Sequence, residues 1–296
     1  MNSQTKPTKP LHIVGCGDIG RRVAARLRAA GQAVSGLVAS PVSCAALRAA
    51  GIEAVEANLD DPASLPGTAL DGVQVFYFAP PPKQGRTDSR MRNWLAALGA
   101  TRPAKIVAIS TTGVYGDVGG DWVTEDTPLA PGADRAWRRV DMETAVRQWG
   151  RQHDVPVVIL RVPGIYSCER LPLERLRKGL PVLTPDEAGY TNRIHADDLA
   201  AIAIAAMQRA PADSVYNVSD GQPGTMTDYF NTIADHFGLP RPPQISLAEA
   251  TTRVSAGMLS YLRESRRISN SKMREELGVT LQYPDLQAGL QDCKRD

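Results

Sequence analysis

The sequence predicts an α/β protein with a doubly wound parallel sheet and a smaller C-terminal α-rich lobe. Two observations carry this prediction. From residue 11 to residue 163, short apolar runs alternate with stretches of helical length and period. These runs are apolar at almost every position, which is typical of strands buried on both faces of a parallel sheet. After residue 163 the alternation stops, which indicates a change of architecture.

The alternating region predicts six strands separated by helices. "LHIVG" begins the series, and the helix after it has Val23, Leu27 and Ala30 at apolar positions before Gly31 ends it. In order, we expect strands at 11–15, 33–38, 52–58, 72–80, 104–111 and 155–163, and helices at 20–31, 40–51, 90–100 and 133–150. Further on, we expect helices at 194–210, 225–239 and 268–279, and a last sheet strand at 214–221.

These elements predict two domains and a tail. The first ten residues, "MNSQTKPTKP", contain two Lys-Pro pairs and are expected to be a flexible tail. The sheet domain is expected to comprise residues 11–165 and 191–220, and the small lobe residues 166–190 and 221–296. The stretch from 169 to 193 is rich in proline and charge, which suits an inserted lobe better than another strand–helix unit.

Composition and charge exclude several classes of protein. Hydrophobic residues make up 43% of the 296 residues and charged residues 22%, as in an ordinary globular domain. The net charge of +2 gives no reason to expect a nucleic-acid partner. No apolar run approaches the roughly 20 residues that cross a bilayer, so no membrane association is expected.

The N-terminal sequence and the cysteines favour a cytoplasmic protein. The first residues have neither the apolar core nor the cleavage site of a secretory signal. Cys16, Cys44, Cys168 and Cys293 lie far apart, with no CxxC pair and no Cys/His spacing of a metal site. We therefore expect a reducing compartment and no bound metal.

A glycine-rich turn joins the first predicted strand to the first predicted helix. "IVGCGDIGRRVA" places Gly15, Gly17 and Gly20 in GxGxxG spacing, with Asp18 and Ile19 between the last two. The first glycine allows the tight turn, the second lets the backbone approach a pyrophosphate, and the third lets the helix pack on the strand. The helix N-terminus faces the anion. This context predicts a Rossmann-type NAD(P)-binding domain.

The end of the second predicted strand favours NADP over NAD. An acidic residue there would bind the ribose hydroxyls of NAD, but no Asp or Glu occurs between Asp18 and Glu53. Arg21, or its neighbour Arg22, and Ser40 could supply charge and a hydrogen bond to a 2′-phosphate. These arginines could equally be solvated helix residues.

Several further segments together resemble the extended short-chain dehydrogenase/reductases, the epimerase/dehydratase group that works largely on nucleotide sugars. "EANLDDPASL" is similar to the segment that walls the adenine pocket, "FAP" to the strand-four turn under the cofactor, "ISTTGVYGD" to the strand-five signature and "LRVPGIYS" to the segment beside the nicotinamide. "NRIHADDLAAI" and "VYNVSDGQP" resemble two later landmarks. The resemblance implies cofactor contacts at Asn58, Leu59, Ala79, Pro80, Pro163, Gly164 and Ile165, and a catalytic Ser/Thr at Thr111.

One segment departs from that family. Its reaction uses a tyrosine and a lysine spaced as YxxxK on one helix face, but here the tyrosine position holds Arg135 and the lysine position Arg139, and YxxxK occurs nowhere in the chain. Arginine stays protonated and cannot serve as the acid–base. Arg139 could still hold the nicotinamide ribose. Arg135 could fix an anionic substrate or a developing oxyanion, or simply face solvent.

Several landmark residues also have ordinary structural explanations. Thr111 could only bond locally at a strand end, and Tyr115 is more often packed than catalytic. His195, followed by two aspartates, resembles a support for a helix N-terminus more than a catalytic histidine. Arg193 could grip a substrate phosphate or face water. Proton donors left open are Tyr166, Tyr190, Tyr115 and water.

These features favour an atypical NAD(P)-dependent oxidoreductase or epimerase-like enzyme on a sugar-nucleotide-like or other anionic substrate. The absent Tyr/Lys pair keeps open a second interpretation, a non-catalytic NAD(P)-binding sensor or scaffold. A lyase or isomerase without net redox change is a third. Members of the family often pair through helices that correspond here to residues 89–100 and 134–150, so a homodimer is also expected.

Overall fold

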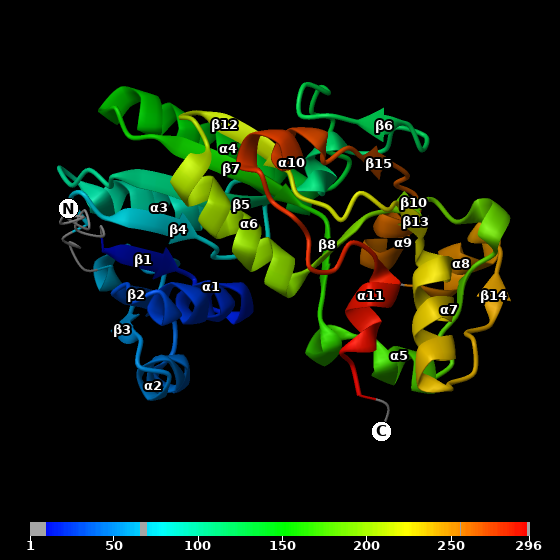
Figure 1. Cartoon of the computed structure of the whole chain (residues 1–296). Helices are drawn as coiled ribbons and strands as arrows, with labels where there is room; N and C mark the ends of the chain where they lie inside the picture. The colour runs from blue at the N-terminus through cyan, green and yellow to red at the C-terminus, as the bar shows by residue number, and fades with distance from the viewer. Residues whose placement is uncertain (1–9, 66–69, 255, 295–296) are drawn as a thin grey trace. The chain divides into compact units, whose positions relative to one another are not determined.

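The computed structural model describes residues 10–65, 70–254 and 256–294 (Figure 1). The chain divides into two compact units. The first comprises Met1–Ser110, Trp137–Leu160 and Ala200–Tyr216, and the second comprises Thr111–Ala136, Arg161–Leu199 and Asn217–Asp296. The predicted small lobe falls wholly within the second unit. Residues 1–9 of the predicted tail lie outside the described residues.

A seven-stranded sheet in the order β12-β7-β5-β4-β1-β2-β3 confirms the predicted fold class. Its strands are β1 (Leu11–Val14), β2 (Val34–Val38), β3 (Glu53–Glu56), β4 (Gln74–Tyr77), β5 (Lys105–Thr111), β7 (Val157–Val162) and β12 (Ser214–Asn217). The blue strand β1 lies between β2 and β4 and is parallel to both (Figure 1). The strand order reverses at β1, and open α/β sheets bind ligands beyond the carboxyl ends of the strands at such a point.

The predicted helices between these strands are also present. They are α1 (Asp18–Ala29), α2 (Pro41–Ala49), α3 (Ser89–Leu98), α4 (Asp134–His153) and α6 (Ala196–Arg209). The side chains of Ser40 and Asp88 accept backbone N–H groups at the starts of α2 and α3, which fixes where these helices begin. A hydrophobic core cluster of the first unit joins β1, β4, α3, α4 and β7 through Val14, Tyr77, Trp94, Met142 and Ile159.

The second unit contains short strands that the sequence did not predict. They form four two-stranded sheets: β8 (Gly164–Tyr166) with β11 (Arg193–His195), β9 (Val182–Leu183) with β14 (Gln244–Ile245), β10 (Tyr190–Thr191) with β13 (Gly224–Thr225), and β6 (Trp122–Val123) with β15 (Arg267–Ile268). Strands of two or three residues are too short to show a period, so only their partners define them.

The helices of the second unit are α5 (Leu173–Arg177), α7 (Met226–Phe237), α8 (Leu247–Arg253), α9 (Ala256–Leu262), α10 (Ser271–Leu277) and α11 (Leu286–Gln291). Single 3₁₀ turns occur at Pro62–Ser64, Thr112–Tyr115, Cys168–Arg170 and Pro185–Glu187. Of the helices, only α7 and α10 were predicted. Both α5 and the red helix α11 lie beside α7 (Figure 1). In the part of the chain that is described, no helix combines the length and apolarity needed to cross a membrane.

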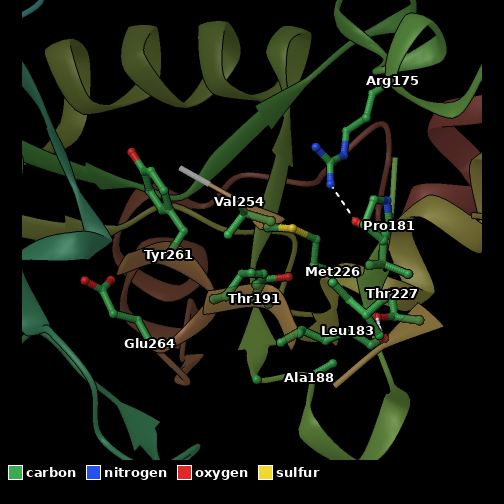
Figure 2. A pocket seen from close by; sticks show the side chains of 15 residues that line it. Arg175, Pro181, Leu183, Ala188, Thr191, Met226, Thr227, Val254, Tyr261 and Glu264 are labelled. Atoms are coloured by element: carbon green, nitrogen blue, oxygen red, sulfur yellow. Dashed lines mark hydrogen bonds between the residues drawn. The ribbon is translucent and has the colours of Figure 1, made fainter. Parts of the chain in front are cut away.

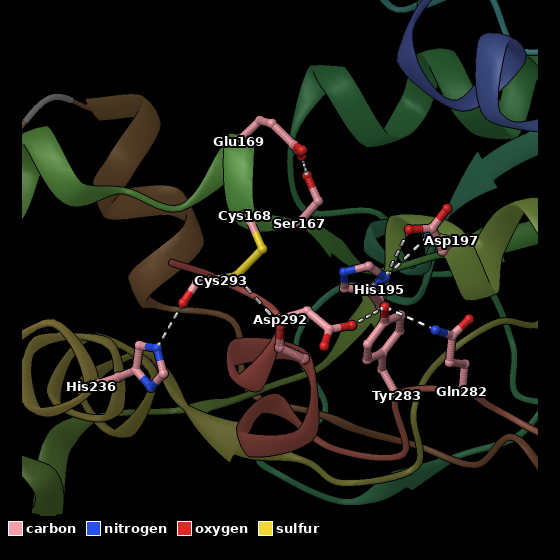
Figure 3. The surroundings of a disulfide bond; sticks show 11 residues. Ser167, Cys168, Glu169, His195, Asp197, His236, Gln282, Tyr283, Asp292 and Cys293 are labelled. Atoms are coloured by element: carbon pink, nitrogen blue, oxygen red, sulfur yellow. Dashed lines mark hydrogen bonds and ion pairs between the residues drawn. A yellow bond between two sulfur atoms is a disulfide. The ribbon is translucent and has the colours of Figure 1, made fainter. Parts of the chain in front are cut away.

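Cys168 and Cys293 form a disulfide within the second unit (Figure 3). It joins the turn after β8 to the end of α11, across 125 residues of sequence. The expectation that the cysteines are all reduced is therefore wrong for this pair. Spacing could not reveal the pairing, because sequence alone does not determine which distant cysteines meet. Cys16 and Cys44 are free and buried.

Candidate functional site

The glycine turn lies between β1 and α1, as the sequence predicts. Gly15 has φ +79°, and a Cβ on it would lie only 2.5 Å from the backbone nitrogen of Ala79, at the end of β4. Its N–H and that of Cys16 both donate to the Leu37 carbonyl, at 3.0 and 3.1 Å. The turn is therefore held by the neighbouring strands on both sides, and only glycine fits at position 15.

The other two glycines have different surroundings. A Cβ on Gly20 would meet Ile13 Cγ2 at 3.1 Å, so this glycine permits close packing of α1 on β1. A Cβ on Gly17 would have no neighbour closer than the Gly15 carbonyl oxygen at 4.0 Å. The backbone at Gly17 is thus bare and faces open space at the N-terminus of α1. The Gly17 N–H itself donates to the Gly15 carbonyl at 2.7 Å, so a pyrophosphate would approach the N–H groups of the first turn of α1.

Cys16 lies inside the turn but is not positioned for thiol chemistry. It is 2% exposed, and burial raises the pKa of its thiol to about 11. Reactive cysteines are partly exposed and have lowered pKa values. Cys16 therefore remains a thiol at neutral pH and acts as a packing residue against Gly20 and Gly36.

Arg21, Arg22 and Ser40 are the residues predicted to select NADP over NAD. Arg22 forms an i,i+4 ion pair with Asp18 at 3.0 Å, whereas Arg21 is exposed. The Ser40 side chain caps α2 and donates to Ser43 Oγ at 2.9 Å. The residues that follow β2 are Ala39 and Ser40, so no carboxylate occurs at this end of the strand.

The segment after β3 is tied to α3. Asn58 Oδ1 accepts the Asp60 N–H at 3.0 Å, and Leu59 is buried in the same core cluster as Ala79. Arg90 binds both carboxylate oxygens of Asp60, at 2.7 and 2.6 Å, and also donates to the Pro80 carbonyl at 3.1 Å. Arg90 thus joins two segments that the resemblance places against the cofactor. No local pattern in the sequence indicates this role.

A buried polar cluster contacts the turn that follows β4. The sequence did not predict it. Arg139 donates to the Ala79 carbonyl at 3.4 Å. Burial lowers the pKa of its guanidinium, although the negative charges of Asp88 and Glu143 act in the opposite direction and raise it. Asp88 is fully buried, and burial raises the pKa of its carboxyl. Its Oδ2 and the Tyr77 hydroxyl have no hydrogen-bond partner among the described residues.

In the second unit, Pro163 directly precedes β8, and Gly164 and Ile165 are the first two residues of that strand. Gly164 is exposed and its N–H donates to the Asn192 carbonyl at 3.2 Å. A Cβ at this position would lie 3.1 Å from Arg193 Nη1. The glycine therefore leaves the guanidinium of Arg193 room beside this segment.

Thr111 ends β5 and accepts the Gly113 N–H on its Oγ1 at 3.2 Å, while its side chain stays partly exposed. Tyr115 is fully buried: its hydroxyl donates to Asn217 Oδ1 at 2.7 Å and accepts from Arg161 at 2.8 Å. These contacts support a structural role for Tyr115. They remove it from the proton donors considered above.

Arg135 already has partners on the segment around α9. Its Nη1 donates to Ser260 Oγ at 2.6 Å, its Nη2 lies 3.5 Å from Glu264 Oε1, and its guanidinium carbon lies 3.6 Å from the Tyr261 ring centre. Glu264 also binds Arg266 at 2.8 Å. Glu264 is therefore shared by two guanidinium groups, and its single negative charge cannot balance both.

A mostly apolar pocket lies beside that segment, and Figure 2 shows Tyr261, Glu264 and Val254 on its wall together with Met226 and Leu183. Arg175 donates to the Pro181 carbonyl at 2.7 Å, which orders the opposite wall. The sequence did not predict this pocket, because its walls come from α5, β9, α7 and α8–α9.

The remaining candidate proton donors are engaged or exposed. The Tyr166 hydroxyl donates to the Asp285 carbonyl at 3.0 Å, and burial raises the pKa of Tyr166 above its usual value. His195 Nδ1 accepts the Asp197 N–H at 3.2 Å at the start of α6, as expected for a supporting residue (Figure 3). Tyr190 is 41% exposed.

The switch point of the sheet, the bare backbone at Gly17 and the N-terminus of α1 define a Rossmann-type dinucleotide-binding protein. The chain belongs to the NAD(P)H-binding family, whose profile matches residues 15–210. It is 25% identical to the protein YeeZ of Escherichia coli K12 over 288 residues, which cover 94% of this chain and 97% of YeeZ.

Solved structures show the same fold over almost the whole chain. A conserved protein of unknown function from Silicibacter pomeroyi is 32% identical, with a TM-score of 0.81 and coverage of 96% of this chain and 97% of that one. DesIV from Streptomyces venezuelae, a dTDP-glucose 4,6-dehydratase solved with NAD and TYD bound, is 21% identical, with a TM-score of 0.77 and coverage of 95% and 94%. Further structural neighbours are described as an NAD-dependent epimerase/dehydratase and as a nucleoside-diphosphate-sugar epimerase.

Proposed function

We propose that the protein is an NAD(P)-dependent oxidoreductase or epimerase-like enzyme of the extended short-chain dehydrogenase type. Its substrate would be a sugar-nucleotide-like or other anionic small molecule, and its reaction would not use a Tyr/Lys pair. The observation that carries the proposal is the bare backbone of Gly17 at the N-terminus of α1, in a turn that Gly15 locks against Ala79.

The residues of the first unit suit a dinucleotide. The N–H groups at the start of α1 would hold the pyrophosphate, where the helix dipole favours negative charge. Asn58 and Leu59 would line the adenine, and Ala79 and Pro80 would lie under the cofactor. Arg139, fixed on the Ala79 carbonyl, would donate to ribose hydroxyls. In the second unit, Pro163, Gly164 and Ile165 would flank the nicotinamide, which when bound supplies or accepts a hydride.

The surroundings of β2 support NADP over NAD. No carboxylate follows this strand to bind free ribose hydroxyls or repel a 2′-phosphate. Arg21 is exposed, and its guanidinium can pair with a phosphate. The Ser40 hydroxyl already caps α2, so we assign the selectivity chiefly to Arg21.

The substrate class rests on similarity of fold and on two residues of the second unit. DesIV acts on dTDP-glucose, and its fold matches this chain over almost its full length. Thr111 would bond a substrate oxygen, because its side chain is partly exposed at the carboxyl end of β5. Arg135 would bind an anionic substrate only by exchanging its present partner Glu264 for the ligand.

The contacts of Arg135 also favour the second candidate, a non-catalytic NAD(P)-binding sensor or scaffold. With Arg135 bound to Ser260 and Glu264, no acid–base group stands at either position of the family's pair. Such a protein would bind oxidised and reduced cofactor with different affinities and change its conformation accordingly.

Calorimetric titration with NADP, NADPH, NAD and NADH at one ionic strength tests both candidates. We expect the phosphorylated pair to bind more tightly, and Arg21→Ala to reduce that preference by about tenfold, the value of one charge-assisted hydrogen bond. Gly17→Ala should weaken all four ligands. Gly224→Ala is its control, because Gly224 lies in the second unit, has no positive φ, and a Cβ there would meet nothing within 4 Å.

The outcomes separate the candidates. Binding of none of the four dinucleotides would refute both. Tight binding followed by hydride transfer to any sugar nucleotide in a substrate panel would establish the enzyme, with Thr111→Ala as the variant expected to lose turnover. Tight binding with no turnover, and with unequal affinities for NADP and NADPH, would favour the sensor.

A further inference from the structure

The disulfide between Cys168 and Cys293 ties the C-terminal helix to strand β8. Cys168 comes two residues after Tyr166, the last residue of β8, and this strand begins at Gly164. Cys293 comes two residues after the end of α11. The bond therefore joins α11 to the segment that the proposed function places beside the nicotinamide.

Helix α11 also packs on the end of β8 through Tyr166. The Tyr166 hydroxyl donates to the Asp285 carbonyl at 3.0 Å, and the bare backbone of Gly289 leaves room for the tyrosine ring. The ring centre of His195, on β11, lies 5.1 Å from that of Tyr166 and 3.9 Å from that of Tyr283. Tyr166 is 2% exposed, so a movement of α11 would uncover the end of β8.

The start of α11 forms part of the wall of a polar cavity in the second unit. The cavity has a volume of about 420 Å³, and Leu286 and Gln287, the first two residues of α11, line it. Arg193 of β11 and Asp220 line it as well. The position of α11 thus decides both the shape of this cavity and the exposure of Tyr166.

Helix α11 is too short to be stable by itself. It has six residues, and isolated helices of fewer than about 12 residues are marginal in water. Leu290 packs into the core cluster of α7, which includes Phe230 and Ile233. At the C-terminal end, Asp292 accepts the Tyr283 hydroxyl at 2.7 Å. The helix therefore depends on its attachments, and the disulfide is the covalent one.

Cys168 is the sulfur that a reductant can reach. It is partly exposed and begins a 3₁₀ turn whose other residues, Glu169 and Arg170, are exposed, whereas Cys293 is 6% exposed. Exposed disulfides are the ones that exchange with thiols. Cys16 and Cys44 are buried in the first unit and are not placed to take part in the exchange.

We propose that the bond between Cys168 and Cys293 is a redox modification site that controls the order of α11, and through α11 the order of β8 and of the cavity wall. A thiolate of a dithiol reductant attacks Cys168 Sγ, the bond between the two cysteines breaks, and Cys293 leaves as a thiolate that takes a proton from water. The second thiol of the reductant, as its thiolate, then attacks the mixed disulfide and releases Cys168. The reductant ends as a disulfide, and the protein has gained two electrons and two protons.

Reduction is expected to detach α11 by local opening, because the remaining contacts of a six-residue helix are few. The opening uncovers Tyr166 and removes one part of the cavity wall. Weaker cofactor binding should follow. This last consequence rests on the proposed function, because it takes β8 as the strand beside the nicotinamide.

Hydrogen exchange of the purified full chain, followed by mass spectrometry, compares the oxidised protein with the protein reduced by dithiothreitol. In the oxidised protein the Ala288 and Gly289 N–H groups donate to Asp285, at 2.8 and 3.2 Å. At short labelling times these amides should exchange about tenfold faster after reduction, while the amides of α7 stay protected. Reoxidation with oxidised glutathione should restore the slow exchange.

Two variants separate the disulfide from other effects of the reductant. Cys293→Ser should show fast exchange in α11 with and without dithiothreitol. Cys44→Ala is the matched control, because it removes a buried thiol of the first unit and keeps the disulfide, so it should respond as wild type does. A bond that dithiothreitol does not reduce in the folded protein, or exchange in α11 that reduction leaves unchanged, would overturn the proposal.

Calorimetric titration with NADPH distinguishes this inference from the proposed function. The oxidised protein is expected to bind NADPH about tenfold more tightly than the reduced protein, the value of one hydrogen bond. Equal affinities would overturn the link from α11 to β8 and leave dinucleotide binding intact. Binding in neither state would refute the proposed function, and the hydrogen-exchange result would then decide the redox site by itself.

Discussion

His12 is an ionisable side chain in β1, an interior strand of the parallel sheet. It is 2% exposed, its Nδ1 bonds Ser35 Oγ at 2.8 Å, and its Nε2 has no partner among the described residues. Burial lowers the pKa of His12 from 6.5 to about 4, so the imidazole stays neutral in the folded protein.

This depressed pKa makes the fold sensitive to acid. Above pH 6.5 the imidazole is neutral in both states and contributes no pH dependence. As pH falls from 6.5 toward 4, only the unfolded chain takes up the proton, and the free energy of unfolding decreases by on the order of 3 kcal/mol. Urea unfolding at pH 7.5, 5.5 and 4.5 measures how steeply the free energy of unfolding falls with pH. His12→Gln should be less acid-sensitive than wild type, and an unchanged slope would contradict the assignment.

Two buried tyrosines make a matched pair. The Tyr77 hydroxyl lacks a partner among the described residues, whereas that of Tyr115 bonds both Asn217 and Arg161. Removing an unsatisfied buried hydroxyl removes a desolvation cost, so Tyr77→Phe should leave the free energy of unfolding unchanged or raise it by about 1 kcal/mol. Tyr115→Phe should lower it by about 1–3 kcal/mol, because two buried groups lose their partner. Equal effects in denaturant titrations would show that Tyr77 has a partner after all.

At the scale of elements, Lys105 joins β5 to the end of α6. Its Nζ donates to the carbonyls of Ala206, Met207 and Ala210, at 2.9, 2.9 and 2.7 Å. The last carbonyls of a helix have no partner within it and form the negative end of its dipole. The ammonium group therefore binds three carbonyls of the helix end at once, of which that of Ala206 also accepts the Ala210 N–H.

Lys105→Met should lower the free energy of unfolding by about 1–3 kcal/mol, because the methionine keeps the apolar stem and loses the donors. Its control is Lys178→Met, which removes an exposed i,i+4 pair with Glu174 and should change stability by less than about 0.5 kcal/mol. Similar losses in the two variants would mean that the helix end does not depend on Lys105.

What the sequence could predict depended on whether the signal was local. The strand–helix alternation and the turn at Gly15, Gly17 and Gly20 are local patterns, and both lie where they were expected. The two-residue strands of the second unit have meaning only through partners up to 145 residues away, as between Trp122 and Arg267, so no window along the chain could find them.

The candidate site divides in the same way. The residues of the glycine turn could be named because their roles follow from their order. Arg90, which binds Asp60 and the Pro80 carbonyl, and Asp88, buried near Arg139, could not be, because each acts through residues distant in sequence. The cavity lined by Arg193 and Asp220 was missed for the same reason: its walls come from three separate segments, residues 191–193, 220–232 and 285–287.

At the scale of the molecule, the disulfide between Cys168 and Cys293 fastens the C-terminal helix. Helix α11 also packs closely on Tyr166, because Gly289 has no side chain. A Cβ at position 289 would lie 2.5 Å from the Tyr166 hydroxyl. Figure 3 shows the Tyr283 hydroxyl bonded to Asp292 and the His236 ring directed to the Cys293 carbonyl. These contacts order the segment that the disulfide closes.

Reduction should therefore loosen the fold. A disulfide that closes a loop of this length restricts the unfolded chain, and its loss should lower the free energy of unfolding by about 2–4 kcal/mol. Thermal unfolding with and without dithiothreitol measures the effect. Cys168→Ser with Cys293→Ser should match reduced wild type and not respond to the reductant. A wild type indifferent to dithiothreitol would show that the bond does not support stability.

The chain passes several times between the two compact units. Reading from the N-terminus, the chain changes unit at residues 110/111, 136/137, 160/161, 199/200 and 216/217. These positions lie inside β5, α4, β7, α6 and β12 respectively. Any cut that isolates one unit must therefore break a strand or a helix. The two units are therefore not modules joined by linkers. Replacing one unit by that of another protein would have to join chains inside strands and helices. A change of substrate specificity must instead arise by substitutions within this one continuous chain.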